Sequence, residues 1–111
     1  MTLLGEFRAE LVEEPSANGD GTRQIVHLVG EVDVATTPSL ASAFGVSFAH
    51  RCTVVVNLAG VTFFGASGIG ELIRAQKHLR AVGCELIVMN APPNVRRVFT
   101  ICGLQDMLSD G

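Results

Sequence analysis

The stretch that decides the fold is Thr53-Val54-Val55-Val56-Asn57-Leu58, together with the turn and the helical pattern after it. It is β-branched and almost wholly apolar, which is typical of a central parallel strand buried on both faces. A Gly-rich turn comes next, and apolar residues then recur at helical spacing over residues 67–82. Gly83 stands where a helix commonly ends in a left-handed residue. A buried strand that leads into an amphipathic helix predicts a right-handed crossover unit.

A second crossover unit follows toward the C-terminus. Residues 85–89 are mostly apolar and predict another buried strand, and Pro92-Pro93-Asn94 opens a third helix that Gly103 ends. The predicted inner face of the second helix consists of Ile69, Leu72, Ile73, Gln76 and Leu79. That of the third helix consists of Val95, Val98, Phe99 and Cys102.

Toward the N-terminus the pattern predicts an antiparallel hairpin. Its strands cover residues 5–12 and 24–29, and the connection contains Asn18-Gly19 and Asp20-Gly21, which favour positive φ. Thr37 followed by Pro38 then predicts a helix start, with Thr37 as N-cap and Pro38 as the first helical residue. This helix extends to about residue 49, and Leu40, Phe44 and Phe48 share one of its faces.

The predicted order is therefore β-β-α-β-α-β-α. It indicates an α/β domain with a mixed β-sheet, in which an N-terminal antiparallel hairpin is followed by parallel strands and the helices pack against the sheet. The length of 111 residues fits one domain, residues 1–111. Hydrophobic residues make up 48% and charged residues 17%, which excludes intrinsic disorder.

Composition also restricts the partners and the compartment. The net charge is −3, so we expect no nucleic-acid binding, which needs clustered Lys and Arg. No uncharged apolar stretch approaches the roughly 18 residues of a membrane span, so we expect no membrane partner. Glu6 and Arg8 come too early for a signal peptide, and we expect a cytoplasmic protein.

The three cysteines and three histidines are scattered, with no spacing that suggests a metal site, and we expect no metal and no cofactor. Cys52 and Cys84 each come one residue before a predicted strand, and the two strands are expected to be adjacent and parallel. A disulfide needs Cα atoms about 4.4–6.8 Å apart, so a redox pair is geometrically allowed if the registers match. A reducing cytoplasm favours the alternative, in which both are small buried thiols.

The turn at residues 65–70 is the densest local signal. Gly65, Gly68 and Gly70 give G-x-x-G-x-G, which is neither the dinucleotide fingerprint nor a P-loop. Ser67 has no His placed by any readable motif to activate it, so we expect no enzyme. The simplest interpretation is that these glycines let the helix turn sharply and pack closely, and nucleotide binding stays open as the weaker alternative.

Several segments resemble the STAS domain of bacterial anti-sigma factor antagonists. They are Gly30-Glu31-Val32-Asp33, Val55-Val56-Asn57-Leu58-Ala59-Gly60-Val61-Thr62-Phe63, Ser67-Gly68-Ile69-Gly70, Gly83-Cys84-Glu85-Leu86-Ile87-Val88, and Val95-Arg96-Arg97-Val98-Phe99 with Gly103-Leu104. The resemblance covers about residues 5–108, in the right order and spacing.

The resemblance implies a regulator rather than an enzyme. Members of this family bind an anti-sigma factor, usually a kinase-like protein, and so release a sigma factor by partner switching. The kinase inactivates the antagonist by phosphorylating a Ser at the start of the second helix, which places nearly two negative charges in the contact surface. The usual pattern there is Asp-Ser-Ser-Gly, whereas this chain has Gly65-Ala66-Ser67-Gly68.

Ala66 occupies the acceptor position and cannot be phosphorylated, and Ser67 is expected to serve as N-cap and to be a weak acceptor. The resemblance implies docking through residues 33–37 and 62–71. The partner-binding residues expected there are Asp33, Thr36, Thr62, Phe64, Gly65, Ala66, Ser67 and Gly68. For Asp33, a role in the turn after the second strand is an equal alternative. A STAS subunit of a stressosome-like or transporter-regulating complex is the alternative function, and a homodimer stays open.

Overall fold

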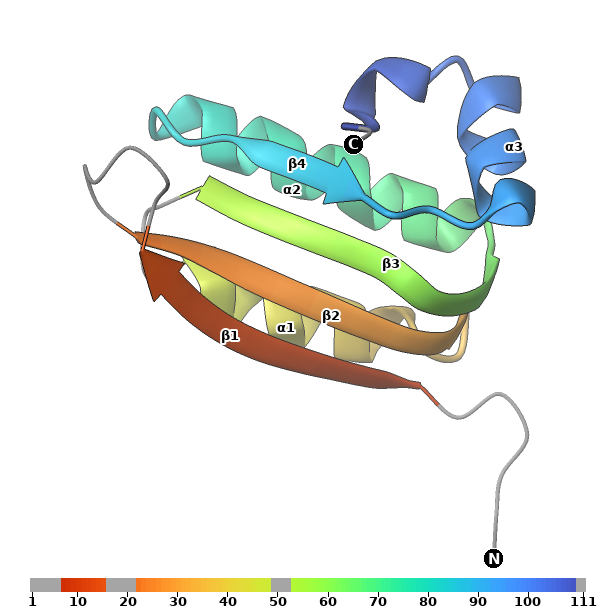
Figure 1. Cartoon of the computed structure of the whole chain (residues 1–111), viewed down its shortest axis with the longest axis horizontal. Helices are drawn as coiled ribbons and strands as arrows, with labels where there is room; N and C mark the ends of the chain where they lie inside the picture. The colour runs from red at the N-terminus through yellow and green to blue at the C-terminus, as the bar shows by residue number, and fades with distance from the viewer. Residues whose placement is uncertain (1–6, 16–21, 49–52, 110–111) are drawn as a thin grey trace, which may run out of the picture.

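A four-stranded mixed sheet lies at the centre of the fold (Figure 1). The computed structural model describes residues 7–15, 22–48 and 53–109. Strand β1 (Arg8–Pro15) pairs antiparallel with β2 (Thr22–Val32), β2 pairs parallel with β3 (Thr53–Phe64), and β3 pairs parallel with β4 (Leu86–Met89). The sheet order is β1-β2-β3-β4, which confirms the predicted hairpin followed by parallel strands.

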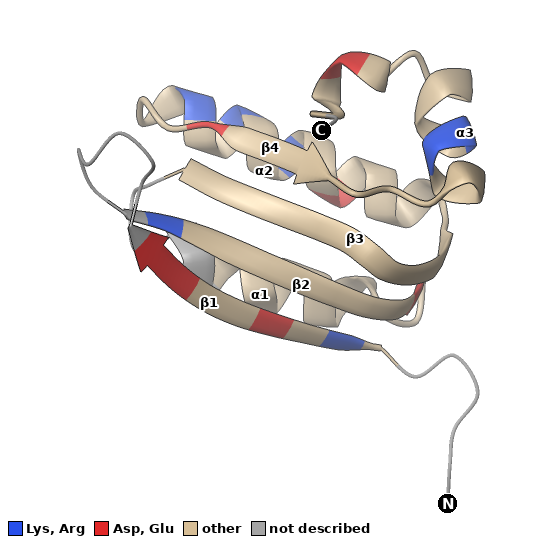
Figure 2. Cartoon of the chain, in the orientation of Figure 1, with Lys and Arg blue, Asp and Glu red and all other residues tan. Residues whose placement is uncertain are grey.

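Two helices, α1 (Thr37–Phe48) and α2 (Ala66–Ala81), lie together behind the sheet (Figure 1). The shorter α3 (Pro93–Ile101) lies beyond the carboxyl end of β4, and the 3-10 turn η1 (Gln105–Met107) follows it. The central strand β3 contains no charged residue, whereas charged residues occur on β1 and along α2 (Figure 2). It fits the prediction of a buried central strand for residues 53–58, of which residues 54–56 and 58 are buried.

The core fills the space between the sheet and the two long helices. Its largest fully buried side chains include Leu28, Leu58, Leu40, Phe44, Leu72 and Leu79. The predicted inner face of α2 is confirmed for Ile69, Leu72 and Leu79, while Ile73 and Gln76 are half-buried. The side chain of Phe48 lies outside the described residues.

α3 packs onto this core through Val95 and Phe99, which are buried as predicted, and through the half-buried Val98. The rings of Phe99 and Phe64 have centroids 5.7 Å apart. The prediction for Cys102 is wrong, because Cys102 is exposed. It is the C-cap residue, one position after the helix ends at Ile101, so the helical periodicity no longer applies to it.

Two strands, β2 and β3, are longer than predicted. β3 continues from Leu58 to Phe64 because register shifts between β2 and β3, one at residues 27–29 and one at 30–31, keep the two strands paired. Gly30 has φ +105° at the second shift, a conformation that glycine adopts without steric cost. β2 also extends to residue 32, whereas β1 begins at Arg8 and ends at Pro15, later than predicted at both ends, and β4 begins at Leu86, one residue later than predicted.

Helix α1 begins one residue earlier than predicted. The Thr36 carbonyl accepts hydrogen bonds from the backbone N–H groups of Ser39 and Leu40, at 3.0 and 3.2 Å. The N-cap position therefore belongs to Thr36, and Thr37 is the first helical residue. Thr36 can take this position because hydrogen bonds to Asp33 and Glu31 hold its side chain in the preceding turn.

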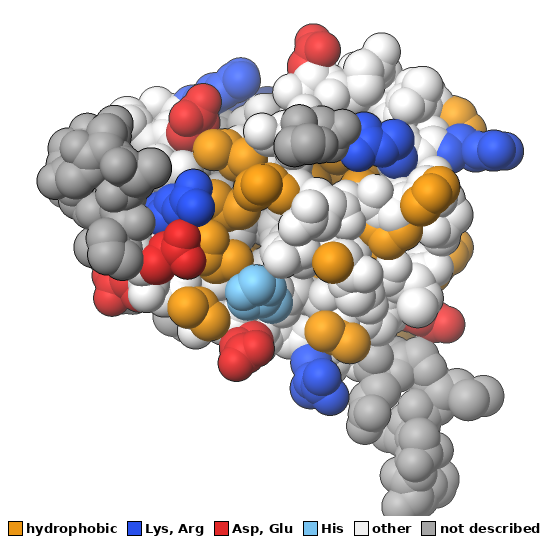
Figure 3. Space-filling view, viewed as in Figure 1, with side chains coloured by type: hydrophobic (Ala, Val, Ile, Leu, Met, Phe, Trp, Pro, Cys, Tyr) orange, Lys and Arg blue, Asp and Glu red, His pale blue; other side chains and the backbone are white. Residues whose placement is uncertain are grey.

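The sheet face opposite α1 and α2 is not covered by any helix of the described residues (Figure 1), and apolar side chains are visible on it in the space-filling view (Figure 3). One row of apolar side chains crosses this face in register: Val12, Ile25, Val55 and Ile87. The next row contains His27 and Asn57, whose Nδ1 and Nδ2 atoms are 3.2 Å apart. The Asn57 Oδ1 also accepts the Ala59 N–H at 2.9 Å, which supports the first register shift.

Two glycines near the start of α2 have different surroundings. A Cβ atom on Gly68 would lie 2.6 Å from Cγ1 of Val32 and 3.0 Å from a ring carbon of Phe64, whereas a Cβ atom on Gly70 would meet nothing within 4 Å. Close packing is thus the reason for Gly68 and does not apply to Gly70. The interpretation of the glycine-rich turn as a packing device therefore holds for Gly68 and not for Gly70.

We expect Gly68→Ala and Gly70→Ala to differ in stability by about 1–3 kcal/mol, the usual cost of overpacking. Both changes bring the same gain in helix propensity, so the difference isolates the clash with Val32. Gly70→Ala should have a higher free energy of unfolding than the parent chain. Gly68→Ala should have a lower free energy of unfolding than Gly70→Ala. Urea denaturation of the two variants and the parent chain measures this, and equal stabilities would contradict the close approach at Gly68.

Candidate functional site

The candidate site is the junction where β2 and β3 end and α1 and α2 begin. Val32 and Phe64, the last residues of the two strands, are register partners. One residue further, the Gly65 N–H donates to the Val32 carbonyl at 2.8 Å. This contact brings residues 33–37 and 62–71 side by side, as the expected docking loops require.

The turn between β2 and α1 is held by reciprocal hydrogen bonds between Asp33 and Thr36. Oδ1 of Asp33 accepts the Thr36 N–H at 3.1 Å, and Oγ1 of Thr36 accepts the Asp33 N–H at 2.9 Å. The Thr36 hydroxyl also donates to the carbonyl of Glu31 at 2.8 Å. Both side chains are half-buried and shape the turn. The structure thereby supports the structural alternative for Asp33 and extends it to Thr36.

The starts of the two helices are joined by a pair of hydroxyl groups. Oγ1 of Thr37 lies 2.9 Å from Oγ of Ser67 and 2.7 Å from the carbonyl oxygen of Asp33. The expectation that Ser67 is the N-cap of α2 is wrong, because the N-cap is Gly65 and Ser67 is the second helical residue. The strand continues to Phe64 and the helix begins immediately afterwards, so the Ser67 hydroxyl points across to α1 instead of capping its own helix.

Two of the expected partner-binding residues are not at the surface. Phe64 is only 1% exposed and packs against Phe99, and Gly68 is buried between Val32 and Phe64. Neither can contact a partner directly. Thr62 and Ala66 are exposed, and Gly65 and Ser67 are half-buried, so these four stay at the junction surface.

The exposed ring at this site belongs to Phe63, which is 50% exposed. Sequence analysis missed it because a one-residue change in register turns a strand residue to the opposite face. Val34, in the turn after β2, is 80% exposed and was also missed. Strict alternation from the buried Val61 predicts that Phe63 faces the core and Phe64 faces outward. The second register shift between β2 and β3 reverses this, so that Phe64 is the buried ring and Phe63 the exposed one.

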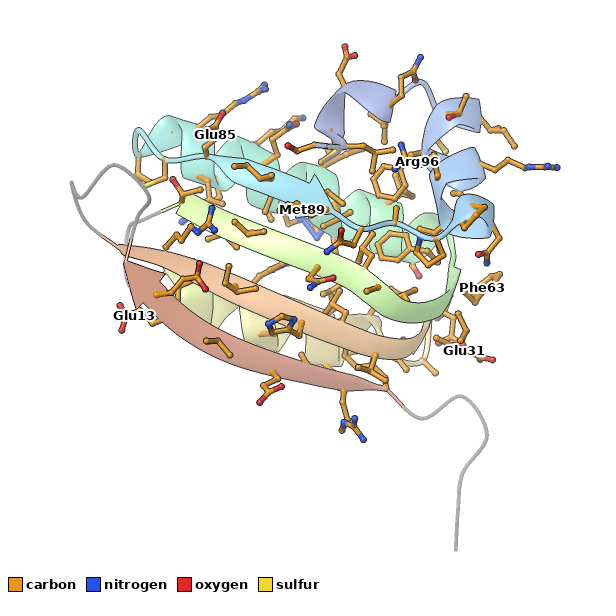
Figure 4. The ribbon with its side chains drawn as sticks, viewed as in Figure 1. Glu13, Glu31, Phe63, Glu85, Met89 and Arg96 are labelled. Carbon is orange, nitrogen blue, oxygen red and sulfur yellow. The ribbon has the colours of Figure 1, made fainter. Side chains whose placement is uncertain are left out.

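The junction surface carries no charge between residues 58 and 70, and acidic groups border it on one side. Glu31 is the register partner of Phe63, and Figure 4 shows the two side chains at the same end of the sheet, opposite to Glu13 and Glu85. On the α3 side, Nδ2 of Asn94 donates to the carbonyl of Thr62 at 3.0 Å. The end of β3 is therefore fixed to the start of α3.

A family model described as the STAS domain matches residues 14–109. The chain belongs to the STAS domain family. It is 27% identical over 88 residues to an anti-sigma F factor antagonist of Lysinibacillus sphaericus, covering 78% of this chain and 75% of that protein. It is 32% identical over 85 residues to an anti-sigma-B factor antagonist of Staphylococcus epidermidis, covering 75% of this chain and 78% of that protein.

The fold of this STAS domain also matches solved structures. The crystal structure of an anti-sigma factor antagonist from Mycobacterium paratuberculosis aligns with a TM-score of 0.80 and 23% identity, covering 99% of this chain and 89% of that chain. At this identity the likeness concerns the fold alone. It agrees with the mixed sheet and the helix arrangement of the present chain.

A hollow of about 200 Å³ lies between α1 and α2 of the STAS domain. Its lining residues are Ala41, Phe44, Gly45, Glu71, Arg74 and Ala75. Glu71 and Arg74 form an ion pair at 2.8 Å, and only the arginine is well exposed. The hollow lies along the two helices and does not include the Gly-rich turn, where the nucleotide alternative would place a ligand.

Other chemistry has little support within the part of the chain that the structure describes. No group of three or more His, Cys, Asp or Glu side chains there could hold a metal ion. No helix in the described ranges is both long and apolar enough to span a membrane. β3 and β4 are adjacent and parallel as the redox pair requires, and Cys84 is a half-buried free thiol. Cys52 lies outside the described residues, so the redox pair stays a prediction.

The hydroxyl bridge between the helix starts predicts a measurable coupling. We expect Thr37→Val and Ser67→Ala each to lower the free energy of unfolding, because each removes one partner of the 2.9 Å contact. The double-mutant cycle should give a coupling of about 0.5–1.5 kcal/mol, as for one intramolecular hydrogen bond. Denaturant unfolding of the four chains measures it, and strictly additive effects would show that the bridge contributes nothing.

Proposed function

We propose that this chain is an anti-sigma factor antagonist, which binds an anti-sigma factor and so frees a sigma factor. The observation that supports this most directly is the uncharged, exposed surface at the junction, formed by Val34, Thr62, Phe63, Gly65 and Ala66 and hereafter called the docking surface. Charged residues are depleted at the centres of protein interfaces. The Lysinibacillus and Staphylococcus relatives are called antagonists of anti-sigma factors, and we infer a partner of the same kind for this chain.

The same surface favours a binding role over catalysis. The hydroxyl groups that border it are engaged in structure, because Thr36 holds the β2–α1 turn and Thr37 is hydrogen-bonded to Ser67. A surface fixed in this way loses little conformational entropy on binding. We infer that the chain acts in the cytoplasm as a protein-binding regulator and not as an enzyme.

The partner is inferred to be a kinase-like anti-sigma factor, but without the usual control by phosphorylation. Ala66 is exposed as the first residue of α2, at the position where the family has its acceptor Ser. A methyl group cannot accept a phosphoryl group. The neighbouring Ser67 is half-buried and hydrogen-bonded to Thr37, which makes it a poor acceptor.

A second candidate function is a STAS subunit of a larger assembly, such as a stressosome-like or transporter-regulating complex. The observation that favours it is the sheet face opposite α1 and α2, which no helix of the described residues covers and on which Val12 is exposed and Ile87 half-buried. A partner-switching antagonist needs one docking surface, whereas an assembly subunit needs several. Sedimentation of the purified chain, alone and with an anti-sigma factor, separates these two functions and also tests the homodimer.

Phosphorylation gives the first test. When the chain is incubated with ATP and each kinase-like anti-sigma factor encoded in its own genome, we expect no phosphate on the parent chain. Ala66→Ser should become phosphorylated, because it places a hydroxyl at an exposed position at the start of α2. Mass spectrometry of tryptic peptides locates the modification. Stoichiometric phosphate on Ser67 of the parent chain would contradict the proposed loss of the switch.

Charge at the docking surface gives the second test. Ala66→Glu should weaken binding to the anti-sigma factor at least tenfold, since an unpaired charge buried in an interface costs on the order of 2–5 kcal/mol. Ala81→Glu is the matched control, because Ala81 is the exposed residue at the other end of α2. Ala66→Glu should not lower the stability, because an acidic residue at a helix N-terminus is favourable. Isothermal titration calorimetry and thermal unfolding measure both effects, and equal affinities of the two variants would place the interface elsewhere.

A further inference from the structure

Two large apolar side chains lie exposed on either side of one backbone contact. Val34 follows the end of β2 and Phe63 lies one residue before the end of β3, and the Gly65 N–H donates to the carbonyl of Val32 between them. Single exposed apolar residues are common on protein surfaces. A Phe that is 50% exposed and a Val that is 80% exposed at the same junction are less easily explained by folding, because neither contributes much to the core.

The absence of a side chain at Gly65 allows the ring of Phe63 to pack against the backbone there. A Cβ atom on Gly65 would lie 3.1 Å from Cε2 of Phe63, which is closer than ordinary van der Waals contact. The ring therefore lies against the backbone at the start of α2, next to the exposed Ala66. A side chain at position 65 would require this ring to shift slightly. The apolar surface is thus continuous from Phe63 across Gly65 to Ala66.

The charges around this apolar centre differ between its two sides. On the α1 side are the carboxylates of Glu31, the register partner of Phe63, and Asp33, the neighbour of Val34 in sequence. On the α3 side the first charged residues are Arg96 and Arg97, one turn into the helix. A complementary partner would carry basic groups on the side that meets α1.

We propose that Phe63 and Val34 are the anchor residues of the docking surface, and that they insert into an apolar pocket of the anti-sigma factor whose rim carries Lys or Arg opposite Glu31. This assignment rests on the proposed function, since the anti-sigma factor is taken as the occupant. Aromatic residues near the centre of an interface commonly contribute most of the binding energy, while opposite charges at the rim set the association rate.

The affinities of Phe63→Ser, Val34→Ser and Ile101→Ser test the anchors. Ile101 is the matched control, because it is 76% exposed and is the last residue of α3. The probes are the anti-sigma factors encoded in the same genome as this chain, each titrated by calorimetry. Phe63→Ser should weaken binding at least about thirtyfold, the size of an interface hot spot, and Val34→Ser about tenfold. Ile101→Ser should stay within about twofold of the parent chain.

The rim charge is tested by association kinetics. Glu31→Gln should lower the association rate constant and reduce its dependence on salt, whereas Glu85→Gln, at the opposite end of the sheet, should change neither. A faster or unchanged association of Glu31→Gln would exclude a basic rim.

The outcomes separate the two levels of inference. If the parent chain binds none of these anti-sigma factors, the proposed function fails. If the parent chain binds but Phe63→Ser and Val34→Ser behave like Ile101→Ser, the function stands and the anchors are overturned. Val34→Ser keeps the test decisive should Phe63→Ser fold poorly, because a side chain that is 80% exposed contributes little to stability.

Discussion

One backbone hydrogen bond fixes the geometry on which the candidate site depends. The Gly65 N–H donates to the Val32 carbonyl at 2.8 Å, one residue beyond the last register pair of β2 and β3. The residue immediately before α2 is therefore hydrogen-bonded to the last residue of β2. Three residues later Gly68 packs directly on the side chain of Val32, where a Cβ atom would come within 2.6 Å. A hydrogen bond and a close contact thus hold the start of α2 against the same residue.

The start of α1 depends on the same place, because its turn begins at the next residue. Asp33 and Thr36 exchange hydrogen bonds within this turn, and Thr37 then reaches Ser67 on α2. The backbone of the exposed residues around the junction is therefore held in place by these hydrogen bonds and by buried contacts. Such preorganisation reduces the entropic cost of binding, which suits the protein-binding role proposed for this surface.

The sequence predicts the architecture well but the surface of the site poorly, for a physical reason. β-branched runs and helical periodicity are local signals, and they identify the strands and helices around Val54 and Leu72. Which of Phe63 and Phe64 faces the core depends on how β2 and β3 are paired, and the register shifts are not encoded in any local pattern. The prediction that Ser67 is an N-cap is wrong because local patterns do not show where β3 ends. The strand continues to Phe64, so Gly65 becomes the N-cap of α2.

The proposed loss of phosphorylation has a second physical consequence at the start of α2. An Asp and a Ser at positions 65 and 66 would put a carboxylate and a hydroxyl there, and the Asp Cβ would require the ring of Phe63 to shift slightly. With Gly65 and Ala66 the ring lies against the helix start and the surface there is apolar. An apolar contact of this kind does not respond to a kinase. If the anchors bind as proposed, release of the partner has to be controlled away from residue 66, through abundance, a competing partner or another part of the fold.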